Sequence, residues 1–304
     1  MAKRILVGAA MLLALASVIA VPQVTVWTEI TQANITEETD GGLIDWTQGF
    51  ILVTGMAVAP LDAQSEAHGK LMAREAALAV AQLRLAEMLE GVRVLGVTAV
   101  RNLILDEAVL ETVVEGQVKM AQIVPELEEW IIPRERFLFF FSRPGDWRNG
   151  EYHVTIQYNL LGEFPVTILP YAIAPPAISE SQDFETTPFS GLIINALGTP
   201  LRTTLFVRLV DPNESEVGVV RGAAYVPSAG YELSLGQLSV ERAEQDPRVG
   251  AAPLTIDVLG VGEDGYSLII SQSAADLVRQ MEATSDILAP QSDRVIVVLD
   301  SAQR

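Results

Sequence analysis

The sequence predicts an α+β protein in which a small sheet packed by one long helix is followed by a second, β-rich α+β domain. An apolar run rich in β-branched residues at 50–58 predicts a strand that is buried on both faces. Apolar residues with helical periodicity follow at 65–89. After a proline-rich interval, short strand-like segments separated by turn residues recur through residues 190–304.

The first twenty residues have the composition of a secretory signal peptide. Lys3 and Arg4 precede an uncharged, apolar run over residues 5–20 that ends in Ala20, and this is the order of segments in an export signal. The run is shorter than the roughly 20 residues that cross a bilayer, although an uncleaved anchor is the alternative. We therefore expect cleavage after Ala20 and no integral membrane span in the mature form.

The charge balance and the absence of cysteine exclude several classes of function. The chain has 20 Lys and Arg residues against 39 Asp and Glu residues, a net charge of −19, and no cysteine. Because no basic patch is available to neutralise phosphates, we expect no binding to nucleic acid. Without cysteine there is no disulfide, iron–sulfur cluster or lipidated cysteine, and we expect no cofactor.

The first domain is predicted to span residues 49–170, after a polar segment at 21–48 that we expect to be a flexible lead-in. Ser65 is the expected N-cap of its long helix, and Gly91 is the expected left-handed residue after the last turn. The apolar side chains of this helix repeat at steps of three and four, and we expect them to face the sheet. They are Met72, Ala76, Ala79, Leu83 and Ala86, joined by Leu71, Leu78, Leu85 and Leu89.

The rest of this domain is predicted as short elements. Apolar and polar residues partly alternate over residues 92–105, which predicts one or two strands. Asp106 can cap a short helix, which Gly116 is expected to break. A strand-like stretch follows at 118–124, and the strictly alternating residues 153–160 are expected to close the sheet.

A proline-rich linker at 171–189 is predicted to separate the two domains. Five prolines fall between residues 165 and 188, and prolines this dense cannot continue a helix or a central strand. We expect few contacts to cross the linker. The β-rich C-terminal domain follows at 190–304 and contains one predicted helix, with Ser273 as its cap.

Four stretches of the first domain occur in the order and spacing of a known family. They are Val53-Thr54-Gly55, Ala73-Arg74-Glu75-Ala76-Ala77, Leu89-Glu90-Gly91-Val92-Arg93-Val94 and Val113-Val114-Glu115-Gly116-Gln117-Val118-Lys119. Together they resemble the twenty-kilodalton outer-membrane lipoprotein family, which includes the flagellar assembly protein FlgP and the amino-terminal domain of FlgT. The resemblance covers about residues 50–160, and the segment at 190–196 is similar to a C-terminal extension of longer members.

This resemblance implies a non-catalytic envelope protein, since members of that family are non-catalytic and some of them form rings around the flagellar rod. The chain departs from the family in lacking the lipobox cysteine, so that membrane tethering is not implied. It also carries a longer insertion at 126–150. A flagellar role does not follow from the resemblance, because the fold is shared by members that have no such role.

Few residues in the sequence could carry chemistry. His68 and His153 fall in different predicted elements and match no two-histidine metal spacing, so we expect structural roles; the alternative is a hydrolase that uses one of them. Residues 211–216 have oxygen ligands at alternate positions but lack the glycine and glutamate of a calcium loop. The acidic cluster at 126–129 is expected to be a solvated turn. We therefore expect no enzyme activity, catalytic residue or metal site.

Aromatic side chains concentrate in the insertion at 126–150. Six of the 13 Phe and Trp residues of the chain lie within residues 130–147. Consecutive apolar residues on one strand point to both of its faces, so that the face turned away from the helix needs a cover from the C-terminal domain, the insertion itself or a partner. The candidate interaction surface consists of Trp130, Phe137, Phe139, Phe140, Phe141 and Trp147.

The sequence therefore favours a non-catalytic, exported envelope protein that acts in assembly or as an adaptor. We expect it in the periplasm or in association with the outer membrane or flagellar basal structures, with protein partners or self-association as its mode of action. The alternative is a periplasmic module that binds a ligand or a peptide between its two domains.

Overall fold

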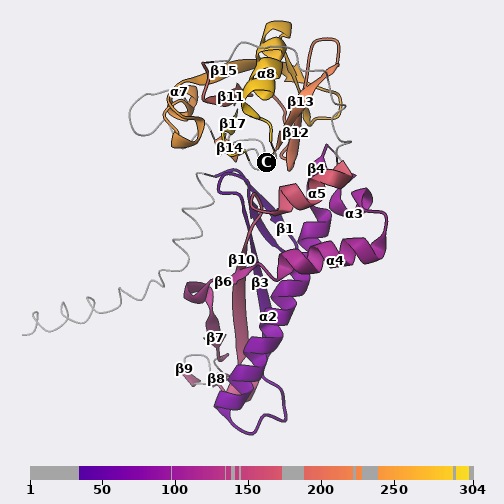
Figure 1. Cartoon of the computed structure of the whole chain (residues 1–304). Coiled ribbons are helices and arrows are strands. Elements are labelled where there is room, and N and C mark those ends of the chain that lie inside the picture. Colours follow the sequence, from indigo (N-terminus) through magenta and orange to yellow (C-terminus); the bar gives the residue numbers. More distant parts are fainter. Residues whose placement is uncertain are drawn as a thin grey trace, which may run out of the picture.

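The protein contains two large sheets and a separate two-stranded one. The computed structural model describes residues 34–96, 98–133, 135–137, 141–143, 145–172, 188–221, 224–227, 239–289 and 292–300. The predicted signal peptide and most of the predicted linker lie outside these residues. The N-terminal sheet and one long helix form the lower part of the molecule in Figure 1, and the C-terminal sheet forms the upper part. Among the helices that the structure describes, none combines the length and the hydrophobicity that a bilayer crossing needs.

The N-terminal sheet is antiparallel, with the strand order β1-β2-β3-β10-β6 and with β7 paired to β10 as well. Its central strands β3 (Phe50–Val58) and β10 (Glu151–Asn159) pair along their full length, which confirms the two strands predicted there. The outer strands are short: β1 (Thr36–Thr39), β2 (Gly42–Asp45), β6 (Gln122–Ile123) and β7 (Glu129–Ile131).

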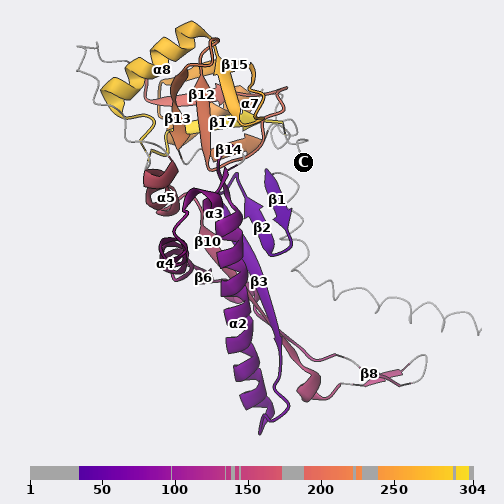
Figure 2. The same ribbon diagram turned by 90° about the vertical axis from the view of Figure 1, so that its right-hand side faces the viewer.

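The long helix α2 (Glu66–Gly91) covers one face of this sheet (Figure 2). Its predicted cap is confirmed, because the Ser65 side chain accepts a hydrogen bond from the His68 backbone N–H at 3.3 Å. The predicted end is wrong in its geometry: Gly91 is the last helical residue, and Val92 caps the helix with an ordinary φ of −56°. No left-handed residue is needed there, since the chain continues directly into an extended strand.

The face of α2 that packs on the sheet is the predicted one only in part. The residues buried against the sheet include Gly69, Ala73, Ala77, Ala81 and Leu85. Their spacing of four places small side chains under the helix and lets the two backbones approach closely. Of the larger residues predicted to face the sheet, Leu85 and Leu89 are buried. Three others face outwards instead: Leu71 is 55% exposed, Met72 41% and Leu83 62%.

Short helices complete the N-terminal half: α3 (Val100–Leu103), α4 (Glu107–Val118) and α5 (Phe164–Ala172), with 3-10 turns η1 (Pro125–Leu127) and η2 (Trp147–Asn149). The cap predicted for α4 is confirmed, since Asp106 accepts hydrogen bonds from the N–H groups of Ala108 and Val109. Gly116 does not break α4, because it lies on an open surface of the helix where nothing competes with the helical conformation. α5 forms despite its internal Pro170.

The flexible lead-in predicted for 21–48 is wrong for the part that the structure describes. Strands β1 and β2 form there, and Leu43, Ile44 and Trp46 are buried. Asp45 holds the turn after β2 by accepting a hydrogen bond from the Gln48 N–H at 2.8 Å. The polar composition misled the prediction because one short apolar stretch is enough to anchor a hairpin on an existing sheet.

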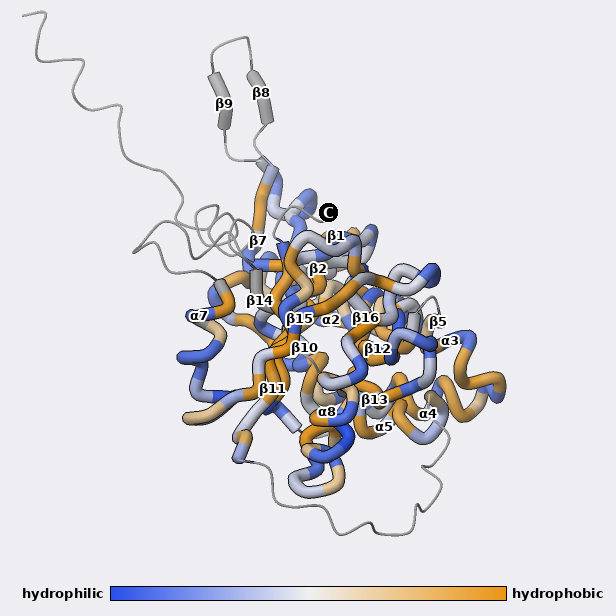
Figure 3. Tube along the Cα trace, turned by 90° about the horizontal axis from the view of Figure 1, so that it is seen from above, coloured by the Kyte–Doolittle hydropathy of each residue, from blue (hydrophilic) through white to orange (hydrophobic). Residues whose placement is uncertain are grey.

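The C-terminal sheet mixes parallel and antiparallel strands in the order β14-β17-β11-β15-β16-β12-β4-β5, with β13 paired to β12. Figure 3 shows hydrophobic residues along β11 at its centre. Its elements from the C-terminal half are β11 (Gly191–Asn195), β12 (Phe206–Val210), β13 (Glu216–Arg221), β14 (Ala224–Pro227), α7 (Ser239–Ala243), η3 (Pro247–Val249), β15 (Pro253–Val261), β16 (Ser267–Ile270), α8 (Gln272–Ser285) and β17 (Val295–Leu299). The cap of α8 is Ser271 rather than Ser273, since the Ser271 hydroxyl accepts the Ala274 N–H.

Two strands from the N-terminal half belong to the C-terminal sheet, and this changes the predicted division of the chain. β4 (Arg93–Leu95) pairs in parallel with β12 and antiparallel with β5 (Thr98–Ala99). The Arg93 carbonyl accepts the Leu205 N–H at 2.8 Å and the Thr204 hydroxyl at 3.1 Å. One hydrophobic core runs through both sheets, so the expectation of few contacts between the two halves is wrong.

This shared sheet predicts how a nicked chain behaves. Limited proteolysis within residues 173–187 should yield two fragments that stay together, because β4 is paired with β12. Gel filtration of the nicked protein under native conditions is expected to give one peak that contains both fragments. Separate elution of the fragments would contradict the pairing of β4 with β12.

Candidate functional site

The aromatic insertion contains a hairpin that stands apart from both sheets. Strands β8 (Glu135–Phe137) and β9 (Phe141–Arg143) form a two-stranded sheet of their own, in which Phe137 is paired with Phe141. In Figures 1 and 2 this hairpin lies at the end of the N-terminal sheet that is farthest from the C-terminal sheet. The C-terminal sheet therefore does not provide the cover that was one of the alternatives for this insertion.

The residues at the centre of the insertion are not on a single strand, as the sequence suggested. β8 ends at Phe137 and β9 begins at Phe141, so the chain reverses between them. Phe139 and Phe140 lie outside the described residues. The argument that neighbouring side chains on one strand point to opposite faces therefore does not apply across this reversal.

The two tryptophans of the candidate surface pack at the base of the hairpin instead of on it. Trp130 on β7 stacks at a tilt on Tyr152, with 6.1 Å between the ring centroids, and its ring lies against Gly150, where an added Cβ would be 2.1 Å from Cζ2. Trp147 lies over Gly69 at the start of α2. These contacts anchor the base of the hairpin to β10 and α2. The two tryptophans therefore stabilise the base, whereas Phe137 and Phe141 lie on the hairpin itself.

An ion pair at Glu128 fixes the same region. It corrects the prediction of a solvated acidic turn for this residue, whereas Glu126 and Glu129 are exposed as predicted. Arg74 of α2 forms a two-pronged contact with Glu128, with Nη2 2.5 Å from Oε1 and Nε 3.0 Å from Oε2, and the Tyr152 hydroxyl donates to Glu128 at 3.0 Å. The hydrogen bond from Arg74 holds the pKa of Glu128 below its usual value. Because Glu128 directly precedes β7, this contact fixes the position of the segment that leads into the hairpin.

The residues considered for catalysis or metal binding are held in local structural contacts. His68 lies in the first turn of α2, where its Nδ1 accepts the Gln64 N–H at 3.4 Å. His153 on β10 contacts Glu151, with Nε2 2.7 Å from Oε1. Within the described part of the chain, no group of three or more His, Asp or Glu side chains is arranged to hold a metal ion.

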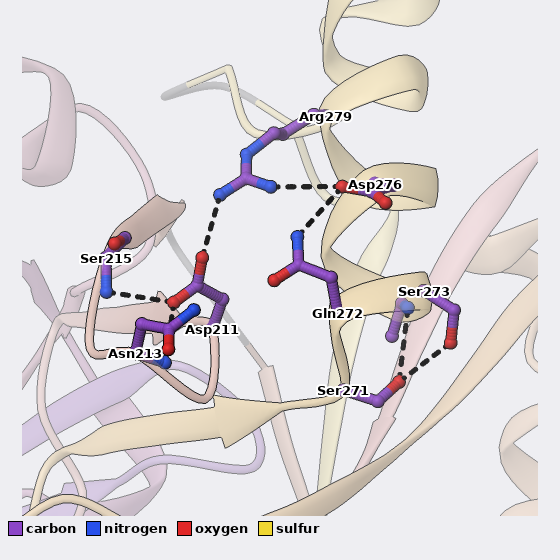
Figure 4. A network of polar contacts seen from close by, with 9 residues as sticks. Asp211, Asn213, Ser215, Ser271, Gln272, Ser273, Asp276 and Arg279 are labelled. Atoms are coloured by element: carbon purple, nitrogen blue, oxygen red, sulfur yellow. Dashed lines mark hydrogen bonds and ion pairs between the residues drawn. The ribbon is translucent and has the colours of Figure 1, made fainter.

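The turn at 211–216 is a structural element that ties α8 to the C-terminal sheet (Figure 4). One oxygen of Asp211 accepts the backbone N–H groups of Asn213 and Ser215 at 2.9 and 3.0 Å. Its other oxygen lies 3.5 Å from Arg279 of α8, which also contacts Asp276. Both oxygens of the Asp211 carboxylate therefore contact protein groups, and residues 211–216 form a turn as predicted.

A cavity of about 880 Å³ lies where the two halves of the molecule meet. One wall is formed by residues 35–38 of β1 and its approach, and the other by residues 200–203, Tyr266 and residues 299–300. Arg93 lies between the walls, where it pairs with Glu37 at 2.6 Å. No local sequence pattern indicates this cavity, because its lining comes from separate segments at residues 35–38, 93, 200–203, 266 and 299–300.

The comparison with known proteins concerns the C-terminal sheet. No curated protein matches the chain. Residues 191–301, which begin with β11 and extend past β17, match the family described as the second domain of Treponema pallidum Tp0624. The C-terminal half is therefore similar to that domain, while the half that carries the aromatic hairpin lies outside the match.

Proposed function

We propose that the protein is a non-catalytic, exported envelope protein that acts in assembly or as an adaptor, and that it binds its partner or another copy of itself through the β8–β9 hairpin. The observation that carries this proposal is the position of the hairpin, a separate two-stranded sheet rich in phenylalanine at the end of the molecule away from the C-terminal sheet. Two short strands alone bury too little surface to be stable in water, which favours a function in contact with another protein.

The construction of the hairpin base supports the same proposal. Trp130, Trp147 and the Arg74–Glu128 ion pair hold both ends of the insertion on α2 and β10. A binding element works best when a rigid scaffold positions it, because less conformational entropy is then lost on association. Phenylalanine residues at the tip of such an element supply the apolar area that anchors many interfaces.

Replacing both Phe137 and Phe141 with serine tests this proposal. We expect the envelope partner captured by crosslinking to be lost, together with any species larger than a dimer seen by light scattering. The melting temperature should change by less than about 2 °C, since β8 and β9 pair with each other and with no other described strand.

The matched control replaces two polar residues of the same hairpin, Arg136 and Ser142, with alanine. These two residues are also paired with each other, so the control changes the hairpin to the same extent without removing an aromatic ring. Association is expected to persist. A wild-type protein that remains monomeric at high concentration and captures no envelope protein contradicts the proposal.

Export is tested separately by the intact mass of the protein recovered from the cell envelope. The basic residues Lys3 and Arg4, the apolar run and the small residue Ala20 support cleavage that leaves Val21 as the first residue. A mass that includes residues 1–20 identifies an uncleaved anchor instead. A protein that is found only in the cytosol contradicts a function in the envelope.

A further inference from the structure

The edge strand β1 turns some of its backbone groups away from the other described strands. Among the described strands, β1 pairs with β2 alone and ends the N-terminal sheet. The Trp46 N–H donates to the Ile35 carbonyl at 2.9 Å, which makes Ile35 and Trp46 a hydrogen-bonded pair. Because such pairs alternate in antiparallel strands, the backbone groups of Thr36 and Glu38 point away from β2. They form a short edge to which another strand can add.

The cavity between the two halves of the molecule lies along this edge. Residues 35–38 form one of its walls, and the buried side chains of Leu201, Tyr266 and Leu299 are among those on the opposite side. Its volume of about 880 Å³ falls in the range of about 300–1,000 Å³ that ligand sites occupy. An extended peptide fits both features, since its backbone can pair with β1 while alternate side chains enter the cavity.

We propose that this edge binds residues 24–30 of a second copy of the chain, in an exchange of amino-terminal strands. The segment reads Val24-Thr25-Val26-Trp27-Thr28-Glu29-Ile30, in which six of seven residues are β-branched or aromatic, the composition that favours a strand. It precedes the first described residue, Asn34, by only three residues. Asn34 adjoins Ile35, which lines the cavity, so the proposed donor shortly precedes the cavity wall in the sequence.

The sequence between the donor segment and β1 favours a second copy over the same copy. A strand that folds back on its own β1 must reverse within Thr31-Gln32-Ala33, and none of these residues is a turn former such as Gly, Pro, Asn or Asp. Asn34 is already fixed, with its amide donating to Asp45 at 2.7 Å, and the Ile35 N–H donates to Thr47. We therefore assign the donor segment to the β1 edge of a second copy rather than to its own. Two copies that exchange segments satisfy both edges in a symmetric dimer.

A pair of substitutions at Glu38 tests the edge. Glu38→Pro removes an N–H that points away from β2, and proline is tolerated on an edge strand at such a position. We expect it to abolish the dimer seen by light scattering, while Glu38→Ala, which keeps the N–H, retains the dimer. Equal dimerisation of the two variants overturns the proposal. Both variants should melt as the wild-type monomer does.

A pair of substitutions at Val26 tests the donor segment, and mixing tests the exchange itself. Val26→Pro is expected to abolish the dimer and Val26→Ala to retain it. A mixture of the Glu38→Pro and Val26→Pro chains should form a heterodimer, because the first supplies an intact donor and the second an intact edge. Absence of this heterodimer, or a dimer in Val26→Pro alone, overturns the proposal.

The absence of native cysteine provides a measurement that does not depend on proline. Chains with Val26→Cys and chains with Glu38→Cys, mixed and oxidised, should give a crosslinked dimer, and its absence counts against the exchange. The proposal is independent of the hairpin, because the Phe137→Ser and Phe141→Ser double variant should still exchange strands. Loss of the dimer in that variant but not in Glu38→Pro assigns self-association to the hairpin and overturns the strand exchange.

Discussion

Replacing Trp46 with alanine is expected to lower the free energy of unfolding by about 3–5 kcal/mol. Trp46 is only 2% exposed and meets the fully buried Tyr225 edge-on, with 5.9 Å between the ring centroids. Its Nε1 donates to Glu37 at 3.3 Å, and Glu37 is the partner of Arg93 in the cavity wall. The substitution therefore removes a contact between the N-terminal hairpin and β14 of the C-terminal sheet as well as a large buried ring.

Calorimetry checks this expectation, and Trp46→Phe is the matched control. Phenylalanine keeps most of the apolar contact with Tyr225 and loses only the bond to Glu37, so that a cost of about 1–2 kcal/mol is expected. The alanine variant is also expected to broaden the transition, because it loosens the contact between the two halves. A Trp46→Ala protein that melts within 2 °C of the wild type, roughly 1 kcal/mol for a chain of this size, contradicts the packing described for this residue.

Replacing Gly55 with alanine is expected to cost about 3 kcal/mol, because there is no room for a methyl group between β3 and α2. A Cβ on Gly55 would lie 2.0 Å from the Ala77 carbonyl oxygen and 2.4 Å from the Ala81 backbone nitrogen. Both obstacles are backbone atoms, so no side-chain rotation can relieve the clash. The helix must move away from the sheet, and the small residues beneath α2 then lose their contacts.

Urea denaturation measures this effect, with Gly116→Ala as the control substitution. Gly116 lies inside α4, and a Cβ there meets nothing within 4 Å. Alanine is favoured over glycine in a helix by about 0.5–1 kcal/mol, so this variant should be slightly more stable than the wild type. If Gly55→Ala has the same midpoint as the wild type, the close approach of α2 to β3 is wrong.

Local sequence patterns predict the elements that are stabilised by residues close together in the sequence. Ser65 and Asp106 were found as helix caps because a cap needs only a side-chain oxygen beside the first turn. The β3 strand was found from its β-branched, apolar composition. The buried face of α2 was predicted only in part, at Leu85 and Leu89. The periodicity also followed large residues such as Met72 and Leu83, whereas close packing selected alanine and glycine.

The candidate site could be predicted only in part, because most of its features depend on distant residues. The aromatic cluster was visible in the composition, but its division between a tryptophan base and a phenylalanine hairpin is set by Gly69, Gly150 and Tyr152. The pairing of Arg74 with Glu128 joins residues 54 positions apart. The junction cavity requires β4 to enter the C-terminal sheet, and no local pattern in Arg93–Leu95 specifies that partner.

The membership of β4 in the C-terminal sheet has a consequence for how the chain is made. Synthesis produces β4 at residues 93–95 long before its partner β12 at residues 206–210, and domains ordinarily fold in the order of their synthesis. The N-terminal half therefore waits for the C-terminal half. In the meantime β4 can pair with β5, but its edge toward β12 stays exposed. A nonsense mutation after α5 leaves that edge permanently without β12, so we expect the shortened product to be a substrate for quality-control proteases rather than a smaller working protein.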